Sequence, residues 1–164
     1  MRTPSLLLAS ALAVALAAGC AAVEPQPGPA KASGSALWAS LQAQDYRAHW
    51  KMWPGKTALY PGREPHGALL TTYVNDVALG AIQGKKGAMG PGAIVVKENY
   101  TPARQLAAIT VMWKIPGYNP AAGDWFWVKY GPNGGIQKEG KVPGCIGCHS
   151  GAAGNDYLFT GPLQ

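Results

Sequence analysis

The residues with the clearest chemical potential lie near the C-terminus, in the sequence Cys145-Ile146-Gly147-Cys148-His149. Two thiols at this spacing can form thioether bonds with the two vinyl groups of one haem, and C-x-x-C-H is typical of c-type haem attachment. The histidine that follows can then ligate the haem iron through an imidazole nitrogen. We therefore predict one covalent haem c, with Cys145 and Cys148 as attachment sites and His149 as the iron ligand.

The C-x-x-C pattern also occurs in zinc sites and in redox-active dithiol pairs. A structural zinc site needs four nitrogen or sulfur ligands, whereas only Cys145, Cys148 and His149 cluster here and the chain has just two other histidines. A thioredoxin-like pair is expected beside a strand–helix unit, but proline and glycine precede this motif and Ser150-Gly151 follows it. Haem is the favoured interpretation, with zinc and a dithiol as the alternatives.

The coordination position opposite His149 decides what such a haem can do. No methionine or histidine follows His149, so a second protein ligand would have to come from upstream. We expect Met112 to fill the core, because it alternates with apolar neighbours along a strand. The remaining candidates are Met52, Met89, His49 and His66. None of them stands out, which favours a five-coordinate iron with an open position over a six-coordinate electron-transfer haem.

The first 20 residues have the features of an export signal. Arg2 gives a positive start, residues 6–18 form an apolar run, and small residues follow. The run is shorter than the roughly 20 residues of a membrane-spanning helix. Cys20 follows directly and resembles the acylated cysteine of bacterial lipoproteins, although Ala17 stands where leucine is usual. We predict a periplasmic or cell-envelope protein that is lipid-anchored to the membrane through Cys20, with ordinary secretory cleavage as the alternative.

Composition adds few constraints beyond these motifs. The chain has 164 residues and a formal net charge of +6, with its lysines and arginines scattered. A mildly basic surface is compatible with an acidic redox partner protein, but a solvated face explains it equally well, and no nucleic-acid-binding motif is evident. The roughly 140 residues left after signal removal are enough for one domain with one core.

The pattern along the chain predicts an α+β fold in which a mostly antiparallel β-sheet of about five strands has flanking helices and the C-terminal C-x-x-C-H segment binds haem. Residues 21–34 form a linker rich in proline and small residues, and residues 35–164 form the domain. Aromatic and apolar residues at helical spacing predict a helix from Ser35 to Trp53, ended by Pro54-Gly55. The predicted strands cover residues 68–74, 93–99, 107–115, 125–130 and 136–141, with a short helix from Asn75-Asp76 to about residue 83.

The domain as a whole, over about residues 36–161, resembles the cytochrome P-460 family, which includes the cytochromes c-prime-beta. The segments that carry the resemblance are Tyr60-Pro61-Gly62, Pro65-His66-Gly67, Tyr73-Val74-Asn75-Asp76, residues 92–100, Gly123-Asp124-Trp125-Phe126-Trp127, Cys145 to His149 and residues 156–160. The resemblance implies a mostly antiparallel β fold, often assembled as a homodimer. It also implies a high-spin, five-coordinate haem whose proximal ligand is His149.

The resemblance implies one of two activities. One branch of the family binds nitric oxide or carbon monoxide in an apolar distal pocket, and we expect this chain to bind nitric oxide or related small nitrogen ligands. The other branch carries a lysine joined to the porphyrin and oxidises hydroxylamine, which would make the chain an enzyme. Lys85 and Lys86 lie roughly where that lysine would fall, and Glu98 is a candidate proton acceptor. All three are equally compatible with solvated or ion-paired surface residues.

Overall fold

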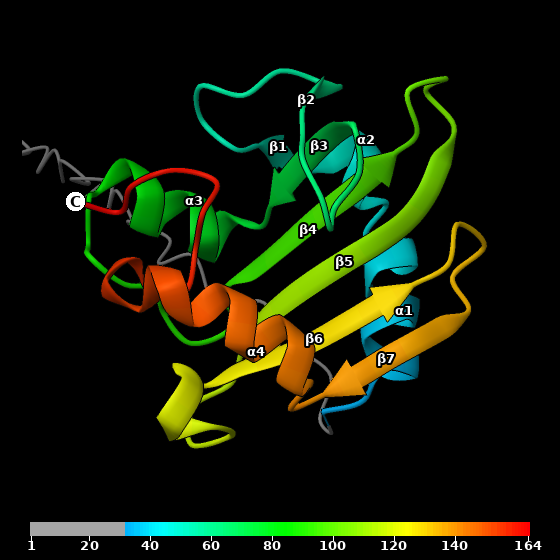
Figure 1. Ribbon diagram of the computed structural model, residues 1–164. Helices are drawn as coiled ribbons and strands as arrows, with labels where there is room; N and C mark the ends of the chain where they lie inside the picture. The colour runs from blue at the N-terminus through cyan, green and yellow to red at the C-terminus, as the bar shows by residue number, and fades with distance from the viewer. Residues whose placement is uncertain (1–31) are drawn as a thin grey trace, which may run out of the picture.

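The computed structural model describes residues 32–164 (Figure 1). The predicted signal, the predicted lipid anchor at Cys20 and most of the predicted linker lie outside the described residues. Within residues 32–164, none of the helices combines the length and the apolar character needed to cross a membrane.

A single antiparallel sheet of seven strands organises the domain. The strands are β1 (Lys51–Met52), β2 (Tyr60–Pro61), β3 (Leu69–Val74), β4 (Ile94–Tyr100), β5 (Leu106–Lys114), β6 (Trp125–Tyr130) and β7 (Ile136–Gly140). Their order across the sheet is β1-β3-β4-β5-β6-β7, and β2 also pairs with β3. The five predicted strands correspond to β3–β7, which confirms the α+β class. The two additional strands, β1 and β2, have two residues each. Such short strands have no recognisable alternation of polar and apolar residues, so the sequence did not predict them.

The first predicted helix is two helices in the structure. Helix α1 (Gly34–Ala43) is capped by the Ser33 side chain, which accepts a hydrogen bond from the Ala36 N–H. Helix α2 (Tyr46–His49) follows after Asp45, whose backbone is left-handed with φ of 40°. A continuous helix from Ser35 to Trp53 is therefore wrong, because a residue at positive φ ends right-handed helical geometry.

The later helices lie on the other side of the sheet. Helix α3 (Asp76–Gln83) begins after Asn75, whose side chain accepts a hydrogen bond from the Ala78 N–H, as the sequence predicted. Helix α4 (Pro143–His149) contains the C-x-x-C-H motif and continues into a 3-10 helix, η2 (Ser150–Asn155), and a short 3-10 turn, η1 (Pro120–Ala122), precedes β6. In Figure 1, α3 and α4 lie in front of the sheet and α1 lies behind it.

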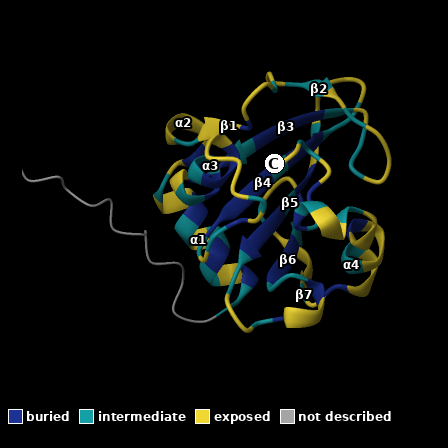
Figure 2. Ribbon diagram, turned by 90° about the vertical axis from the view of Figure 1, so that its left-hand side faces the viewer, coloured by how far each residue is buried: buried dark blue, intermediate teal, exposed yellow. Residues whose placement is uncertain are grey.

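Both faces of the sheet are therefore covered, and its central strands are mostly buried (Figure 2). Each face has its own apolar cluster. Ile109, Val111 and Trp113 point from one face of β5 toward the side of α1, as their alternation predicted. Met112 points from the opposite face toward α3 and α4, together with Trp127 of β6. Consecutive residues of the central strands thus enter two different environments, and the functional cavity lies on the side of α4.

Candidate functional site

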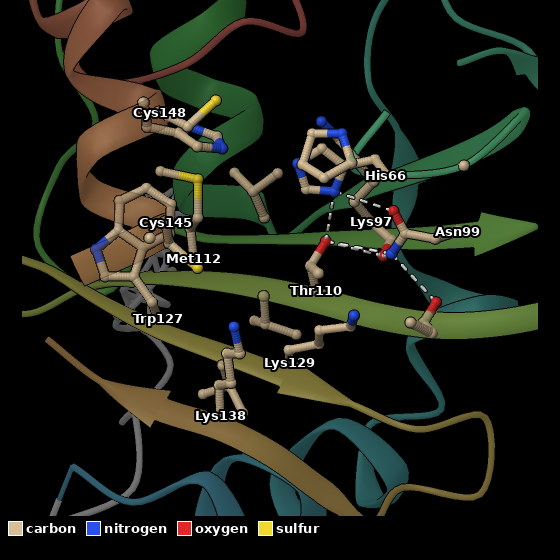
Figure 3. Close-up of a pocket in the computed structure, with 18 of the residues that line it drawn as sticks. His66, Lys97, Asn99, Thr110, Met112, Trp127, Lys129, Lys138, Cys145 and Cys148 are labelled. Atoms are coloured by element: carbon tan, nitrogen blue, oxygen red, sulfur yellow. Dashed lines mark hydrogen bonds between the residues drawn. The ribbon is translucent and has the colours of Figure 1, made fainter. Parts of the chain in front are cut away.

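A cavity of about 440 Å³ lies between the sheet and helix α4 (Figure 3). Its walls come from strands β4 to β7, the loop around His66, the helix α4, and the segment from Leu158 to Thr160. Cys145, Cys148 and His149 all line it. The three residues that the sequence singled out therefore meet at one hollow, on the side of the sheet opposite α1.

Helix α4 explains how the motif reaches the cavity. Pro143 occupies the first turn of this helix, where a missing N–H carries no penalty and the fixed φ suits the helix. On a helix, residues three and four positions apart share one face, so Cys145, Cys148 and His149 project to the same side. Both cysteines are free thiols in the structure, with Cys145 half-buried and Cys148 exposed.

His149 is held in one tautomer by a backbone carbonyl. Its Nδ1 lies 2.6 Å from the carbonyl oxygen of Tyr157, and because a carbonyl can only accept, Nδ1 carries the proton and Nε2 carries the lone pair. Burial lowers the pKa of His149, so the ring is neutral at pH 7. A histidine that donates its second N–H to a carbonyl is the usual arrangement of a metal ligand.

The backbone around Tyr157 is itself anchored by Asp156. The buried carboxylate of Asp156 accepts from Lys114 Nζ at 2.5 Å and from the Met89 N–H at 2.7 Å. The backbone carbonyl of Asp156 accepts from Trp125 Nε1 at 3.0 Å. The carbonyl that orients His149 is therefore one residue away from contacts to β5, β6 and the loop before β4. No local sequence signal marks this role of Asp156, because only the folded chain brings its partners together.

One row of cavity residues is cationic. Strand register aligns Lys97 of β4 with Thr110 of β5, then with Lys129 of β6 and Lys138 of β7. Figure 3 shows the three lysines entering the cavity from the sheet. Burial lowers the pKa of Lys97 to about 8, and the nearby charge of Lys56 adds to the effect. A row of amines on one face of a sheet suits an anionic group in the cavity.

The neighbouring row is apolar. Val95, Met112 and Trp127 are paired across β4, β5 and β6, two residues away from Lys97, Thr110 and Lys129, and they line the same cavity. The indole Nε1 of Trp127 is buried and has no hydrogen-bond partner among the described residues. An apolar wall beside a cationic wall matches the chemistry of a porphyrin, which has an apolar ring and two carboxylates.

The residues present therefore fit a haem better than a zinc ion. Cys145 and Cys148 offer thiols at the cavity wall, and His149 offers an oriented nitrogen lone pair. Across residues 32–164, by contrast, no three His, Cys, Asp or Glu side chains come together in a group that could hold a metal ion. Zinc with four nitrogen or sulfur ligands finds no counterpart in this part of the chain.

A second histidine lines the cavity opposite α4. His66 Nδ1 lies 3.0 Å from Asn99 Oδ1 (Figure 3). The ring centroid of His66 is 6.0 Å from that of His149, with the two rings at 89°. Burial lowers the pKa of His66 to about 4, and the positive charge of Lys97 acts in the same direction. The ring is therefore neutral at pH 7. From the sequence, His66 was only one of several candidate ligands.

The candidate distal residues from the sequence lie elsewhere. Lys85 and Lys86 are exposed in the loop after α3, and neither is among the residues that line the cavity. Glu98 is fully buried on the face toward α1, where its carboxylate accepts hydrogen bonds from Tyr46 and Tyr100 and pairs with Arg47. The residue of β4 that brings an amine to the cavity is instead Lys97, the neighbour of Glu98.

The candidate ligands other than His66 are also separated by the fold. Met112 belongs to the apolar row that lines the cavity, and it is also a member of the core cluster, as expected. Met89 is buried in the same core cluster but is not a cavity residue. Met52 and His49 are exposed and lie outside the cavity. His66 alone among the predicted candidates combines a nitrogen ligand with a place opposite His149.

Comparison with known proteins agrees with the resemblance found in the sequence. The family model described as Cytochrome P460 matches residues 43–160. None of the curated proteins matches the chain. The matched range contains the whole sheet, the His66 loop and helix α4 with its motif.

Proposed function

The chain belongs to the cytochrome P460 family, and on this premise we propose that it carries a covalent haem c whose iron binds nitric oxide or a related small nitrogen ligand. Family membership implies a haem protein that acts on nitrogen compounds. The observation that carries the finer proposal is helix α4, which presents two thiols and a tautomer-locked His149 to one cavity. The same cavity supplies both an apolar and a cationic wall.

The chain's own residues divide the work of holding the group. Cys145 and Cys148 would hold the haem through thioethers and His149 Nε2 would ligate its iron, while the Tyr157 carbonyl keeps that ring oriented. Lys129 and Lys138, which line the cavity, would offset the charge of the propionates, and Met112 and Trp127 would keep water from the ring. When bound, the haem supplies an iron centre that nitric oxide can coordinate.

Expression in a host with haem c maturation machinery tests the proposal. We expect a coloured protein whose mass exceeds that of the polypeptide by one haem, and whose haem survives acid–acetone extraction. We expect the ferrous absorption bands to shift when nitric oxide is added. The double substitution Cys145→Ala and Cys148→Ala should abolish covalent attachment, whereas the control Cys20→Ser should retain it. A colourless protein, or a haem protein whose spectrum ignores nitric oxide, would refute the proposal.

Hydroxylamine oxidation is the second candidate function, and Lys97 is the observation that favours it. A lysine bonded to the porphyrin must have a reactive amine in the cavity, and Lys97 lies there with a pKa lowered to about 8. In this alternative, Lys97 takes the place that the sequence assigned to Lys85 or Lys86. A cross-link would give a far-red ferrous band and a mass below that of polypeptide plus haem. Lys97→Met should remove both signatures, while Lys85→Met should leave them intact.

We also propose that the protein is exported to the periplasm or cell envelope and anchored by a lipid on Cys20. The support is the signal-like sequence of residues 1–20 together with haem attachment, which takes place outside the cytoplasm in c-type cytochromes. Fractionation of the Cys20→Ser variant tests the anchor, since release from the membrane fraction is expected and unchanged fractionation would contradict it. A homodimer and an acidic redox partner are further proposals, which size-exclusion chromatography and pull-down with the loaded protein can test.

A further inference from the structure

The segment that follows α4 and η2 contains two consecutive residues with left-handed backbone geometry, and neither is glycine. Asp156 has φ of 52° and Tyr157 has φ of 65°. Positive φ is uncommon for residues with a side chain, and least expected for a bulky one such as tyrosine. Backbone strain of this kind persists only where the surroundings fix it, and it gathers at functional sites. Here the strained turn ends at the carbonyl that accepts from His149 Nδ1 at 2.6 Å.

Asp156, the first residue of the turn, is fixed by three partners from different parts of the fold. Its carboxylate accepts from Lys114 Nζ at 2.5 Å and from the Met89 N–H at 2.7 Å. Its backbone carbonyl accepts from Trp125 Nε1 at 3.0 Å. These partners lie on β5, in the loop before β4, and on β6. The peptide unit between the two left-handed residues is therefore tied directly to the sheet.

Tyr157, the second residue of the turn, is held by both its backbone and its side chain. Its N–H donates to the Ala152 carbonyl at 2.9 Å, and its hydroxyl donates to the Ala121 carbonyl at 3.2 Å. Its ring packs so closely on Gly123 that a Cβ there would lie 2.9 Å from a ring carbon. Because these contacts fix Tyr157 on several sides, its carbonyl is held in one direction, toward His149.

The direction of this carbonyl matters for the chemistry of His149. A hydrogen bond from Nδ1–H to a carbonyl orients a ligating imidazole and raises the basicity of its other nitrogen. A more basic ligand stabilises ferric iron more than ferrous iron, and hydrogen bonding to a ligand is one of the means by which a protein adjusts a haem. A carbonyl that could turn away would weaken this effect, so the rigidity of the turn determines its size.

We propose that Asp156 and Tyr157 are positioning residues for the iron ligand, and that their strained turn fixes the hydrogen bond from His149 and thereby lowers the reduction potential of the bound haem. This inference rests on the proposed function, because it needs a haem attached at Cys145 and Cys148. Neither Asp156 nor Tyr157 lines the cavity. Both therefore act through His149 and not on the haem itself.

Uncharged substitutions in the haem-loaded protein test the inference, because removing the Asp156 charge would itself shift a potential. Tyr157→Gly keeps the carbonyl but releases the ring and the backbone strain. The ferric-to-ferrous ratio at a fixed potential should fall by about threefold to tenfold, a rise in reduction potential of roughly 30 to 60 mV for one electron. The iron–histidine stretching frequency of the ferrous protein, measured by resonance Raman spectroscopy, should decrease. Trp125→Phe, which removes only the hydrogen bond to the Asp156 carbonyl, should shift both readouts less in the same directions. Leu59→Gly, at φ of 54° outside the cavity, is the matched control and should leave both unchanged.

Two results would overturn the assignment: a Tyr157→Gly variant with the frequency and potential of the wild type, or a Leu59→Gly variant that shifts as much as Tyr157→Gly. If Tyr157→Gly does not fold, Tyr157→Asn takes its place, because asparagine tolerates left-handed geometry and lacks the ring. Failure of the proposed function gives a different result, since no haem is then attached. If the haem is attached and binds nitric oxide but the variants match the wild type, the proposed function stands and only the positioning role is lost.

Discussion

Removal of the Asp156 carboxylate should strongly destabilise the protein. Asp156 pairs with Lys114 Nζ, and the two side chains are only 7% and 14% exposed. Its second oxygen accepts from the Met89 N–H at 2.7 Å. The substitution Asp156→Asn keeps an oxygen for that N–H but removes the charge, whereas Asp156→Ala removes both.

The expected size follows from the burial of the pair. Breaking a buried ion pair by removing one partner costs about 3–5 kcal/mol, because the remaining charge is left uncompensated. Lys114 keeps some solvent contact, so about 3 kcal/mol is expected for Asp156→Asn. A buried N–H without an acceptor costs about 1–3 kcal/mol, and Asp156→Ala should therefore lose at least about 1 kcal/mol more.

Urea unfolding followed by far-ultraviolet circular dichroism measures these losses on the haem-loaded protein. Lys114→Met provides the matched control, since it removes the charge that Asp156→Asn leaves behind. In the double variant, part of the loss should return, on the order of 2 kcal/mol, as a coupling energy in the double-mutant cycle. If Asp156→Asn costs less than about 1 kcal/mol, or if Lys114→Met fails to compensate, the pair is not the buried anchor described above.

Three further predictions concern residues away from the proposed iron ligand. Gly134→Ala should lower the free energy of unfolding in urea by about 3 kcal/mol, because Gly134 has φ of +86° and a Cβ would overlap the Trp38 ring. The control Gly55→Ala should lower it by only about 1 kcal/mol, because Gly55 has φ of +79° but no atom lies within 4 Å of the added Cβ. Trp125→Phe should cost about 2 kcal/mol through loss of the hydrogen bond from Nε1 to the Asp156 carbonyl, and an unchanged unfolding midpoint would contradict this. Burial raises the pKa of Tyr130, so its contribution to stability is complete below pH 10 and is lost as the pH rises above 10. Tyr130→Phe should therefore make the urea midpoint decline less steeply between pH 9 and 11. Equal slopes for the wild type and the variant would exclude the effect.

The sequence predicted the long elements well because each has a strong local signal. Strand β6 has the predicted bounds, Trp125–Tyr130, and Asn75 caps α3 as expected. The break between α1 and α2 was invisible, because the apolar spacing continues across it. Tyr46 is buried, as its place in the apolar spacing predicted, even though the backbone turns at Asp45. The spacing of apolar residues indicates which side chains are buried, but it does not reveal a single residue with left-handed backbone geometry.

The site was predictable only where one segment contains all of it. Cys145, Cys148 and His149 are a local motif, and the structure brings all three to the cavity. Lys97 and Glu98 illustrate the limit, since neighbouring strand residues point to opposite faces. Both faces of this sheet are covered by helices, so the sequence did not tell which face held the cavity. The partnership of His66 with Asn99 likewise depends on how the loop before β3 folds back onto β4.

The aligned lysines on β4, β6 and β7 have a practical consequence for handling the polypeptide before maturation. Lys129 and Lys138 are directly opposite each other, and like charges in such a pair repel by up to about 1 kcal/mol, whereas Thr110 separates Lys97 from Lys129. The carboxylates of the proposed haem would relieve this repulsion only once the group is bound. Chains that have not yet received the proposed haem should therefore be sensitive to the choice of buffer ion, with phosphate or sulfate protecting them better than chloride. Because strand pairing places these three lysines in one row, we expect the haem-free polypeptide to be best purified in phosphate and at moderate rather than low ionic strength.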